Sequence, residues 1–302
     1  MAFTAKDVQT LREKTGVGMM DCKKALIEAN GDMAKAIDYL RERGLAAAAK
    51  KAGRIAAEGA VDAFVTENAG ALVEINSETD FAAGSDNFKS FAALIAKTVA
   101  GQNPADVDAL LALTPAGEKD TVQELLQEKI LTIGENIKIR RFVRYEGVVA
   151  SYIHGGGRIG VLVKFNTEVS AANSDAFKEL SKDICMQVAA ANPLFLDEAA
   201  VPAETLEYER KILTEQVVNE GKPAAIAEKI VNGKLGKYYK ENCLLEQPFI
   251  KDGDITVKQH LANVSKAVGV DITVAAFARL EKGEGLQKRE DNFADEVANM
   301  IK

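Results

Sequence analysis

The chain has 302 residues, 47% of them hydrophobic and 27% charged, which are the proportions of an ordinary soluble protein and leave room for about two domains. Its formal charge of −7 argues against direct nucleic-acid binding or a membrane-surface role, because both need a positive field. The sequence has neither an apolar run of the roughly 20 residues that a membrane span needs nor a leader-like start, so we expect a cytoplasmic protein.

Residues 1–54 are predicted to form a module of three helices. The first helix should end at Gly16, because glycine adopts the left-handed conformation that terminates helices. A second helix is predicted at 21–29 and a third at 32–44, where Asp32 supplies the N-cap and Gly44 the end. The Ala- and Lys-rich run 45–51 predicts a helical linker to the rest of the chain.

An internal repeat follows the linker. Residues 72–76 (LVEIN) match 162–166 (LVKFN); a strand-like segment precedes each, and a Ser-Asp-x-Phe-Lys helix start follows. Each unit is therefore predicted to be a β-hairpin, a loop and a helix that ends at Asn-Pro. Since one unit alone cannot cover its sheet, we expect an α+β protein whose core is two repeated subdomains packed on each other, at 55–146 and 147–282.

Four further segments complete the predicted core. Residues 122–132 have a helical pattern, and the alternation in 136–145 (NIKIRRFVRY) is typical of a strand. Residues 244–250 and 272–280 are predicted to rejoin the core as strands.

A helical hairpin is predicted as an insertion at about 195–243. Its two helices, 204–220 and 223–239, are joined by Gly-Lys-Pro, the expected punctuation between two helices. A projecting hairpin of this kind is a candidate homodimer contact. The chain is predicted to close with a C-terminal module at 283–302 that carries a short amphipathic helix at 291–302.

Motifs for catalysis or cofactors are weak. Residues 155–160 (GGGRIG) match G-x-G-x-x-G, but a strand-like run follows them instead of a helix, which favours a hairpin turn over a dinucleotide site. The three cysteines match neither a disulfide framework nor a metal-ligand spacing, and we expect them to be buried thiols. We therefore expect no cofactor, no metal and no catalytic residue.

The loop after the second strand differs between the two repeats. The first copy is one residue longer and carries Thr79, Asp80 and Phe81 where the second has Val169 and Ser170. The scaffold common to both copies therefore does not need this tip. Two interpretations remain: Asp80 caps a helical turn while Phe81 packs on the protein's own core, or Phe81 is an exposed anchor for a partner.

Two motifs resemble the signatures of the elongation factor Ts family: 11–26 (LREKTGVGMMDCKKAL) and 78–81 (ETDF). The resemblance covers essentially the whole chain, including 133–136 (IGEN) and 154–160 (HGGGRIG). It implies that the N-terminal module is ubiquitin-associated-like. It also implies a nucleotide-exchange factor without covalent chemistry, which binds elongation factor Tu in its GDP-bound and nucleotide-free forms and speeds GDP release so that GTP can enter.

By position, the resemblance further implies the contact residues. Phe81 would be a wedge between two helices of the partner's GTPase domain, placed with the help of Asp80 and Thr79, and would disturb the magnesium site there. The C-terminal helix would embrace the partner from the other side. The remaining implied contacts are Arg12, Met19, Met20 and Lys23 in the module, Ile133, Gly134, Glu135, Asn136 and His154 near the tip, and Ile250.

The sequence departs from the family pattern in two places. Ala82, Ala83 and Gly84 follow the tip where relatives have bulkier or polar residues, which implies a smaller contact area and a more flexible loop exit. Lys251 stands beside Ile250 where some relatives have methionine, which is a departure at this corner of the implied interface. Two other functions stay open: an adaptor that recruits partners through its N-terminal module, and, with less support, an enzyme with a pocket of converging ionisable groups.

Overall fold

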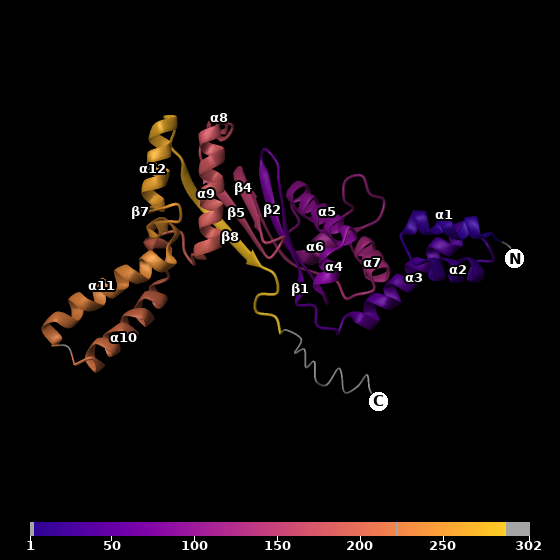
Figure 1. Cartoon of the computed structure of the whole chain (residues 1–302), viewed down its shortest axis with the longest axis horizontal. Helices are drawn as coiled ribbons and strands as arrows, with labels where there is room; N and C mark the ends of the chain where they lie inside the picture. The colour runs from indigo at the N-terminus through magenta and orange to yellow at the C-terminus, as the bar shows by residue number, and fades with distance from the viewer. Residues whose placement is uncertain (1–2, 222, 288–302) are drawn as a thin grey trace.

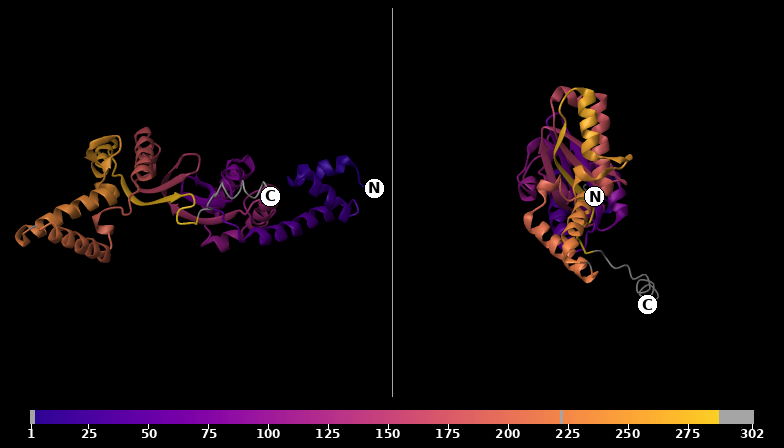
Figure 2. Two further views of the ribbon diagram at one scale, coloured as in Figure 1. Left: turned by 60° about the horizontal axis from the view of Figure 1, so that its bottom comes forward. Right: turned by 90° about the vertical axis from the view of Figure 1, so that its left-hand side faces the viewer.

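The computed structural model describes residues 3–221 and 223–287. It is elongated: three N-terminal helices lie at one end, two β-sheets in the middle and a helical hairpin at the other end (Figures 1 and 2). The mixture of helices with antiparallel sheets confirms the predicted α+β class. The helix predicted at 291–302 lies outside the described residues. Among those residues, no helix is both long and apolar enough to cross a membrane.

The N-terminal helices are α1 (Ala5–Thr15), α2 (Met19–Glu28) and α3 (Met33–Lys51). Helix α1 starts at a capping box of Thr4 and Asp7 and ends at Gly16, whose φ is 66°. The prediction that the third helix ends at Gly44 is wrong. Gly44 is buried against the helix α7 (Val122–Ile133), and a Cβ on it would lie 3.4 Å from the backbone oxygen of Gln127. Gly44 is not in the left-handed conformation that terminates a helix, and the predicted helix and linker are one continuous helix.

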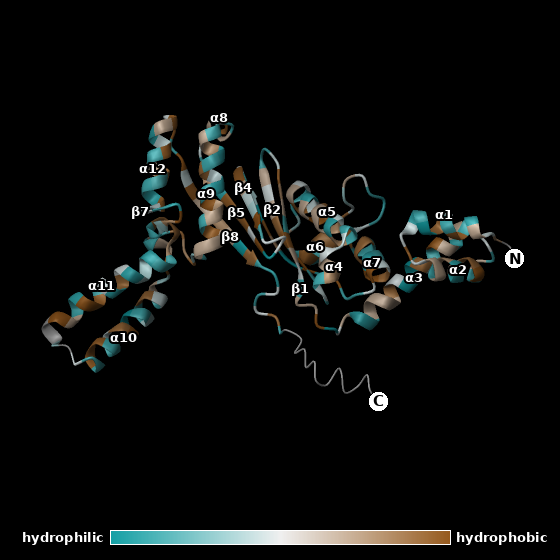
Figure 3. Cartoon of the chain, viewed as in Figure 1, coloured by the Kyte–Doolittle hydropathy of each residue, from teal (hydrophilic) through white to brown (hydrophobic). Residues whose placement is uncertain are grey.

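The centre of the molecule consists of two antiparallel three-stranded sheets. The first has the order β1 (Glu58–Val65), β2 (Ala69–Ser77), β3 (Lys138–Glu146), and α5 (Asp86–Gln102), α6 (Val107–Leu111) and α7 pack on it. Of the three helices on the first sheet, α5 and α6 contact its strands, and α7 packs on α5 and α6. The second has the order β4 (Val148–His154), β5 (Ile159–Asn166), β8 (Thr273–Glu281), with α9 (Asp175–Ala191) against it and α12 (Val257–Val268) against α9. In Figure 3 the strands are mostly apolar, whereas α11 and α12 carry long polar stretches.

The repeat in the sequence corresponds to a repeat in the structure. In each unit a strand pair leads into a short helix, α4 (Asp80–Gly84) or α8 (Val169–Ala172), and then into a 17-residue helix, α5 or α9. Both long helices are capped by a serine side chain, Ser85 or Ser174. Both end at an asparagine in the left-handed conformation, with φ of 50° at Asn103 and 46° at Asn192.

The two sheets pack face to face through a layer of apolar side chains, which are Val61, Leu72, Val149, Leu162 and Leu280. Glycine sets how closely they approach. A Cβ on Gly160 would lie 2.4 Å from Val61 Cγ1, and a Cβ on Gly70 would lie 2.7 Å from Val149 Cγ1. Both distances are far below van der Waals contact, so the sheet separation requires these two glycines.

The insertion begins with the 3₁₀ turn η1 (Glu198–Ala200) and forms a hairpin of α10 (Ala203–Asn219) and α11 (Ala224–Asn242), which has a small core of Val217, Val231 and Leu235. The strand predicted at 244–250 is largely wrong. The chain forms the 3₁₀ turn η2 (Leu244–Glu246) and then only a two-residue strand, β6 (Pro248–Phe249), paired with β7 (Asp252–Thr256). The turn is favoured because it buries the Gln247 side chain, which donates hydrogen bonds to the backbone oxygens of Glu241 and Ala191.

Candidate functional site

The Asp80-Phe81 tip lies at the start of α4, directly after β2. Thr79, and not Asp80, is the helix cap, because its hydroxyl accepts a hydrogen bond from Ala82 N–H at 3.2 Å. Phe81 is 89% exposed and points away from the core, so the interpretation that it packs on its own protein is wrong. Ala82 and Ala83, in contrast, are buried. Their small side chains therefore reduce the packing beneath the tip and do not reduce the exposed area that could contact a partner.

Two carboxylates fasten this loop to the end of α7. Glu135 accepts hydrogen bonds from the backbone N–H groups of Glu78 and Thr79, both at 3.0 Å, and from the Thr79 hydroxyl at 2.6 Å. In the opposite direction, Glu78 accepts one from Asn136 N–H at 2.7 Å. Arg54, just after α3, forms an ion pair of 3.3 Å with Glu78. The base of the tip, residues 78 and 79, is therefore held both by the segment after α7 and by Arg54 after α3.

The predicted contact segment 133–136 lies next to the tip. Ile133 is half-buried against the first core, and Gly134 is exposed with φ of 87° as it ends α7. Asn136 is only 2% exposed, and its side chain donates to the backbone oxygen of Arg54 at 2.8 Å. The whole segment therefore lies at the site, but the polar groups of Glu135 and Asn136 already form hydrogen bonds within the chain.

His154 is exposed at the end of β4, where its Nδ1 lies 3.1 Å from the Tyr152 hydroxyl. The three glycines that follow have φ between 59° and 97°, and the chain returns as β5, so the hairpin-turn interpretation of 155–160 is confirmed. Gly157 accepts a hydrogen bond from Val61 N–H, while Glu58 at the start of β1 is paired with Ser77. The His154 turn and the tip therefore lie at the same end of the first sheet.

The four predicted contact residues of the N-terminal helices, Arg12, Met19, Met20 and Lys23, are all exposed. Met20 is 73% exposed, an unusual position for a large apolar side chain. Ile27, also exposed, extends the same face of α2, since it follows Met20 and Lys23 by seven and four residues. Its helical spacing from Met20 and Lys23 is the signal in the sequence that points to Ile27, which is not among the predicted contact residues.

Ile250 is exposed in the turn between β6 and β7, and its N–H donates to the Gln187 side chain at 2.8 Å. The neighbouring Lys251 reaches back to Asp183, a buried carboxylate of α9, at 2.6 Å. This ion pair raises the pKa of Lys251 through the hydrogen bond that it donates. Lys251 thus ties the turn between β6 and β7 to helix α9. Figures 1 and 2 show this turn and α2 on opposite sides of the sheets.

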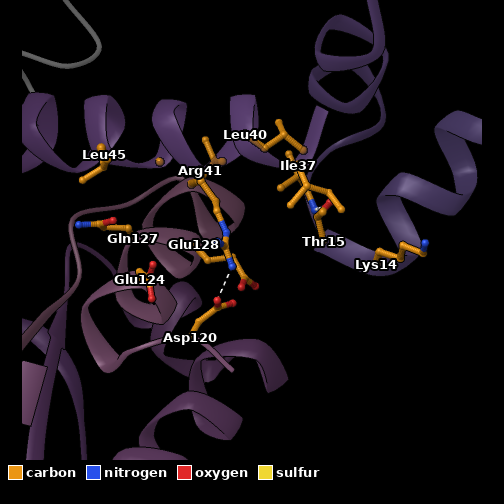
Figure 4. Close-up of a pocket in the computed structure, with 13 residues that line it drawn as sticks. Lys14, Thr15, Ile37, Leu40, Arg41, Leu45, Asp120, Glu124, Gln127 and Glu128 are labelled. Carbon is orange, nitrogen blue, oxygen red and sulfur yellow. Dashed lines mark hydrogen bonds and ion pairs between the residues drawn. The ribbon is translucent and has the colours of Figure 1, made fainter. Parts of the chain in front are cut away.

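A pocket of about 200 Å³ lies where the N-terminal helices meet α7 (Figure 4). Arg41 of α3 forms an ion pair with Asp120 across it, and Leu40 and Gly44 form part of its wall. Lys51 at the end of α3 also donates to the backbone oxygen of Ile130 at 3.3 Å. These contacts hold the N-terminal helices against the core.

Ionisable groups elsewhere are mostly structural. Within the described ranges, no three or more His, Cys, Asp or Glu side chains are placed to hold a metal ion. Cys22, Cys185 and Cys243 are buried and unpaired, which confirms the buried-thiol prediction. Burial raises the pKa of Cys185 to about 12 and, together with nearby carboxylates, that of Cys243 to about 11.

Comparison with known proteins identifies the chain. A family model described as elongation factor Ts matches residues 78–284. An elongation factor Ts of Clostridium perfringens (strain SM101 / Type A) is 55% identical over 303 residues, covering 99% of both chains. One of Clostridium botulinum (strain Eklund 17B / Type B) is 50% identical over 304 residues, again covering 99% of both. The α+β fold with its Asp80-Phe81 tip is thus that of a translation elongation factor, which acts in protein biosynthesis. The chain is a member of the elongation factor Ts family.

Proposed function

We propose that this chain is a guanine-nucleotide exchange factor that binds elongation factor Tu with GDP, promotes release of the GDP and leaves the nucleotide-free form ready for GTP. The observation that carries the proposal is Phe81, an aromatic side chain 89% exposed on a tip fixed to the core, in a chain that belongs to this family. Aromatic side chains in such positions supply binding energy at interfaces.

In the proposed mechanism Phe81 enters the space between two helices of the partner's GTPase domain. Asp80 and Thr79 help to place it, and the displaced helices disturb the magnesium site that holds GDP. No proton transfer or covalent step is involved. A factor that binds the nucleotide-free partner better than the GDP form weakens nucleotide binding by the same ratio, because the coupling is reciprocal.

The energy required indicates that Phe81 does not act alone. A thousandfold faster release requires about 4 kcal/mol of differential stabilisation. Burying one phenylalanine contributes roughly 1.5–3 kcal/mol. We assign the remainder to flanking contacts, which are Ile133, Gly134 and His154 beside the tip, Arg12, Met19, Met20 and Lys23 on the N-terminal helices, and Ile250.

The division of labour that we propose follows the predicted domains. Residues 1–54 form a ubiquitin-associated-like module that docks on the partner, 55–146 carry the tip and 147–282 carry Ile250. Residues 283–302 form a C-terminal module that embraces the partner. The hairpin of α10 and α11, with Tyr208, Val218 and Ile226 exposed, is a candidate surface for a homodimer. The factor acts in the cytoplasm. It uses no cofactor and binds neither nucleic acid nor a membrane directly.

The direct test measures release of a fluorescent GDP analogue from elongation factor Tu with and without the chain. Phe81→Ala should leave binding measurable and slow release by at least about tenfold. Val169→Ala is a matched control, because Val169 is an exposed apolar residue of the corresponding loop in the second repeat. Release at the wild-type rate by the Phe81 variant, or equal losses in both variants, contradicts the mechanism.

The adaptor hypothesis makes the opposite prediction. If the N-terminal module alone recruits partners, deleting residues 1–54 abolishes function while Phe81→Ala has no effect. The exchange mechanism predicts loss of affinity after the deletion and loss of rate after the tip substitution.

A further inference from the structure

The side chain of Phe81 has little contact with its own protein, although Ala82 and Ala83 beside it are buried. Helix α4 has only five residues, which is too short for a helix to be stable by its own hydrogen bonds. Phe81 projects into solvent, and nothing lies within 4 Å of a Cβ built on Gly84 at the exit of the turn. The orientation of Phe81 therefore depends on the packing of Ala82 and Ala83 and on the hydrogen bonds at the base of the loop.

Glu135 accepts three hydrogen bonds at this base, and the Ser77 hydroxyl donates a further one to the Thr79 backbone oxygen at 2.9 Å. Both oxygens of Glu135 are used: one accepts the two N–H groups of Glu78 and Thr79, and the other accepts the Thr79 hydroxyl. The hydroxyl proton is thereby directed to Glu135, which leaves the Thr79 oxygen free to accept Ala82 N–H and cap α4. One carboxylate thus determines the backbone of two residues and the capping of the helix that carries Phe81. Hydrogen bonds to an ionised acceptor are also the stronger kind.

The connection is reciprocal. Glu78 accepts Asn136 N–H, so each segment supplies a carboxylate to the backbone of the other across 56 to 58 residues of sequence. The Asn136 side chain continues the connection to the backbone of Arg54. The base of the tip is consequently joined both to the end of α7 and to the end of α3.

We propose that Glu135 is a positioning residue for nucleotide exchange, which acts through Thr79 to hold Phe81 in its inserting orientation and does not itself contact the partner. This inference rests on the proposed function. A tip that is held in place before binding loses little conformational freedom when it inserts, so its burial energy is available for displacing the partner's helices. A loose tip uses part of that energy to become ordered.

The first test separates rate from affinity. Glu135→Ala should lower the maximal rate of GDP release by about tenfold, because small errors in placement reduce rates steeply, and should change the half-saturating concentration less than about threefold. Glu135→Gln should fall between wild type and Glu135→Ala, because the amide oxygen still accepts N–H groups. The opposite split, an unchanged maximal rate with a raised half-saturating concentration, indicates direct partner contact and overturns the proposal.

The control is Glu124→Ala. Glu124 closes the capping box with Thr121 at the opposite end of α7, so its loss weakens the same helix without touching the tip. It should lower the melting temperature comparably and leave the maximal rate of release unchanged. If Glu124→Ala slows release as much as Glu135→Ala, the effect is one of general stability and positioning is refuted.

A double substitution tests whether Glu135 acts through the aromatic ring. In a Phe81→Ala background, Glu135→Ala should slow release by less than about twofold more, because coupled residues are not additive. A further tenfold loss in that background overturns the proposal.

A last readout is independent of exchange. The chain contains no tryptophan, so Phe81→Trp places a single tryptophan at the tip, whose fluorescence can be excited apart from that of the tyrosines. Adding Glu135→Ala should lower its fluorescence anisotropy in the free protein, while adding Glu124→Ala should not. Unchanged anisotropy refutes the positioning role even if exchange is observed; lowered anisotropy in a protein that fails to release GDP supports the positioning role and refutes only the proposed function.

Discussion

Glu74 and Gly283 are 209 residues apart in the sequence and are joined by a hydrogen bond of 2.8 Å from the glycine N–H to the carboxylate. Glu74 is fully buried on β2 and also forms ion pairs with Arg140 and Arg141, at 2.9 and 2.6 Å. Burial alone would raise the pKa of Glu74, but the Gly283 N–H and the two guanidinium groups hold it below its ordinary value. This cluster joins the end of β8 to the first sheet.

Glu74→Gln should lower the free energy of unfolding by about 3 kcal/mol, because it leaves two arginines facing a neutral buried group. Urea unfolding followed by circular dichroism measures the loss. Glu284→Gln is the control: Glu284 pairs with Arg141 but is half exposed, so the loss should stay below about 1 kcal/mol. Equal losses in the two variants would contradict the role given to burial.

The same carboxylate makes stability depend on pH. Because the folded-state pKa of Glu74 is depressed, its contribution is present above the ordinary pKa of the group and is lost as pH falls through the folded value. Between pH 5 and 3 the wild type should therefore lose stability more steeply than Glu74→Gln. Parallel curves would show that Glu74 does not titrate differently on unfolding.

His260 should add a second pH dependence at a higher pH. Burial lowers its pKa; Asp183, which lies 3.6 Å away, and Glu179 act in the opposite direction, and Lys251 adds to the lowering. The unfolded state therefore takes up a proton first as pH falls through the ordinary value, so stability present above about pH 6.5 is lost as pH falls below it. His260→Gln should flatten this part of the unfolding profile, and a profile identical to that of wild type would show that the prediction is wrong.

Gly160→Ala tests the packing of the sheets. The added methyl would meet Val61 and Leu72, so we expect a loss of about 1–3 kcal/mol in thermal or urea unfolding. Gly101→Ala is the control, because Gly101 lies in α5 with nothing within 4 Å of the added carbon and should be neutral or slightly stabilising. A neutral Gly160 variant would mean that the sheets can separate without cost.

Met20→Asp tests the face of α2. If this face docks on elongation factor Tu, the substitution should weaken binding by about tenfold, which corresponds to 1.4 kcal/mol, and leave the maximal rate of GDP release unchanged. Val169→Asp is the control, since Val169 is similarly exposed, at 63% against 73% for Met20, but lies on α8 of the second repeat. Unchanged binding by the Met20 variant would remove α2 from the interface.

What the sequence could predict depended on how local the signals were. The serine caps at Ser85 and Ser174 and the left-handed ends at Asn103 and Asn192 are properties of a few neighbouring residues, so α5 and α9 were found where they lie. The prediction at Gly44 is wrong because glycine can end a helix or remain inside one. The helix continues where α3 packs on α7, some 80 residues later in the sequence, and the local sequence does not contain that contact.

The candidate site follows the same rule. The comparison of two neighbouring loops was enough to single out Phe81. The hydrogen bonds between Glu135 and Thr79 beneath it could not be predicted, because they depend on how α7 packs with the first sheet. A family resemblance places Glu135 near the partner, but only the coordinates show that its oxygens are already occupied.

The continuity of α3 through Gly44 has a consequence for how contacts at the two ends of this helix would combine. A helix of 19 residues is about 28 Å long and rigid, so α3 keeps the distance between α2 and the tip nearly constant. If both surfaces engage one partner, the second contact forms at a high effective concentration once the first has formed. Inserting a few flexible residues near Gly44 would interrupt the helix and lower this effective concentration, so the overall affinity should fall although no contact residue is altered.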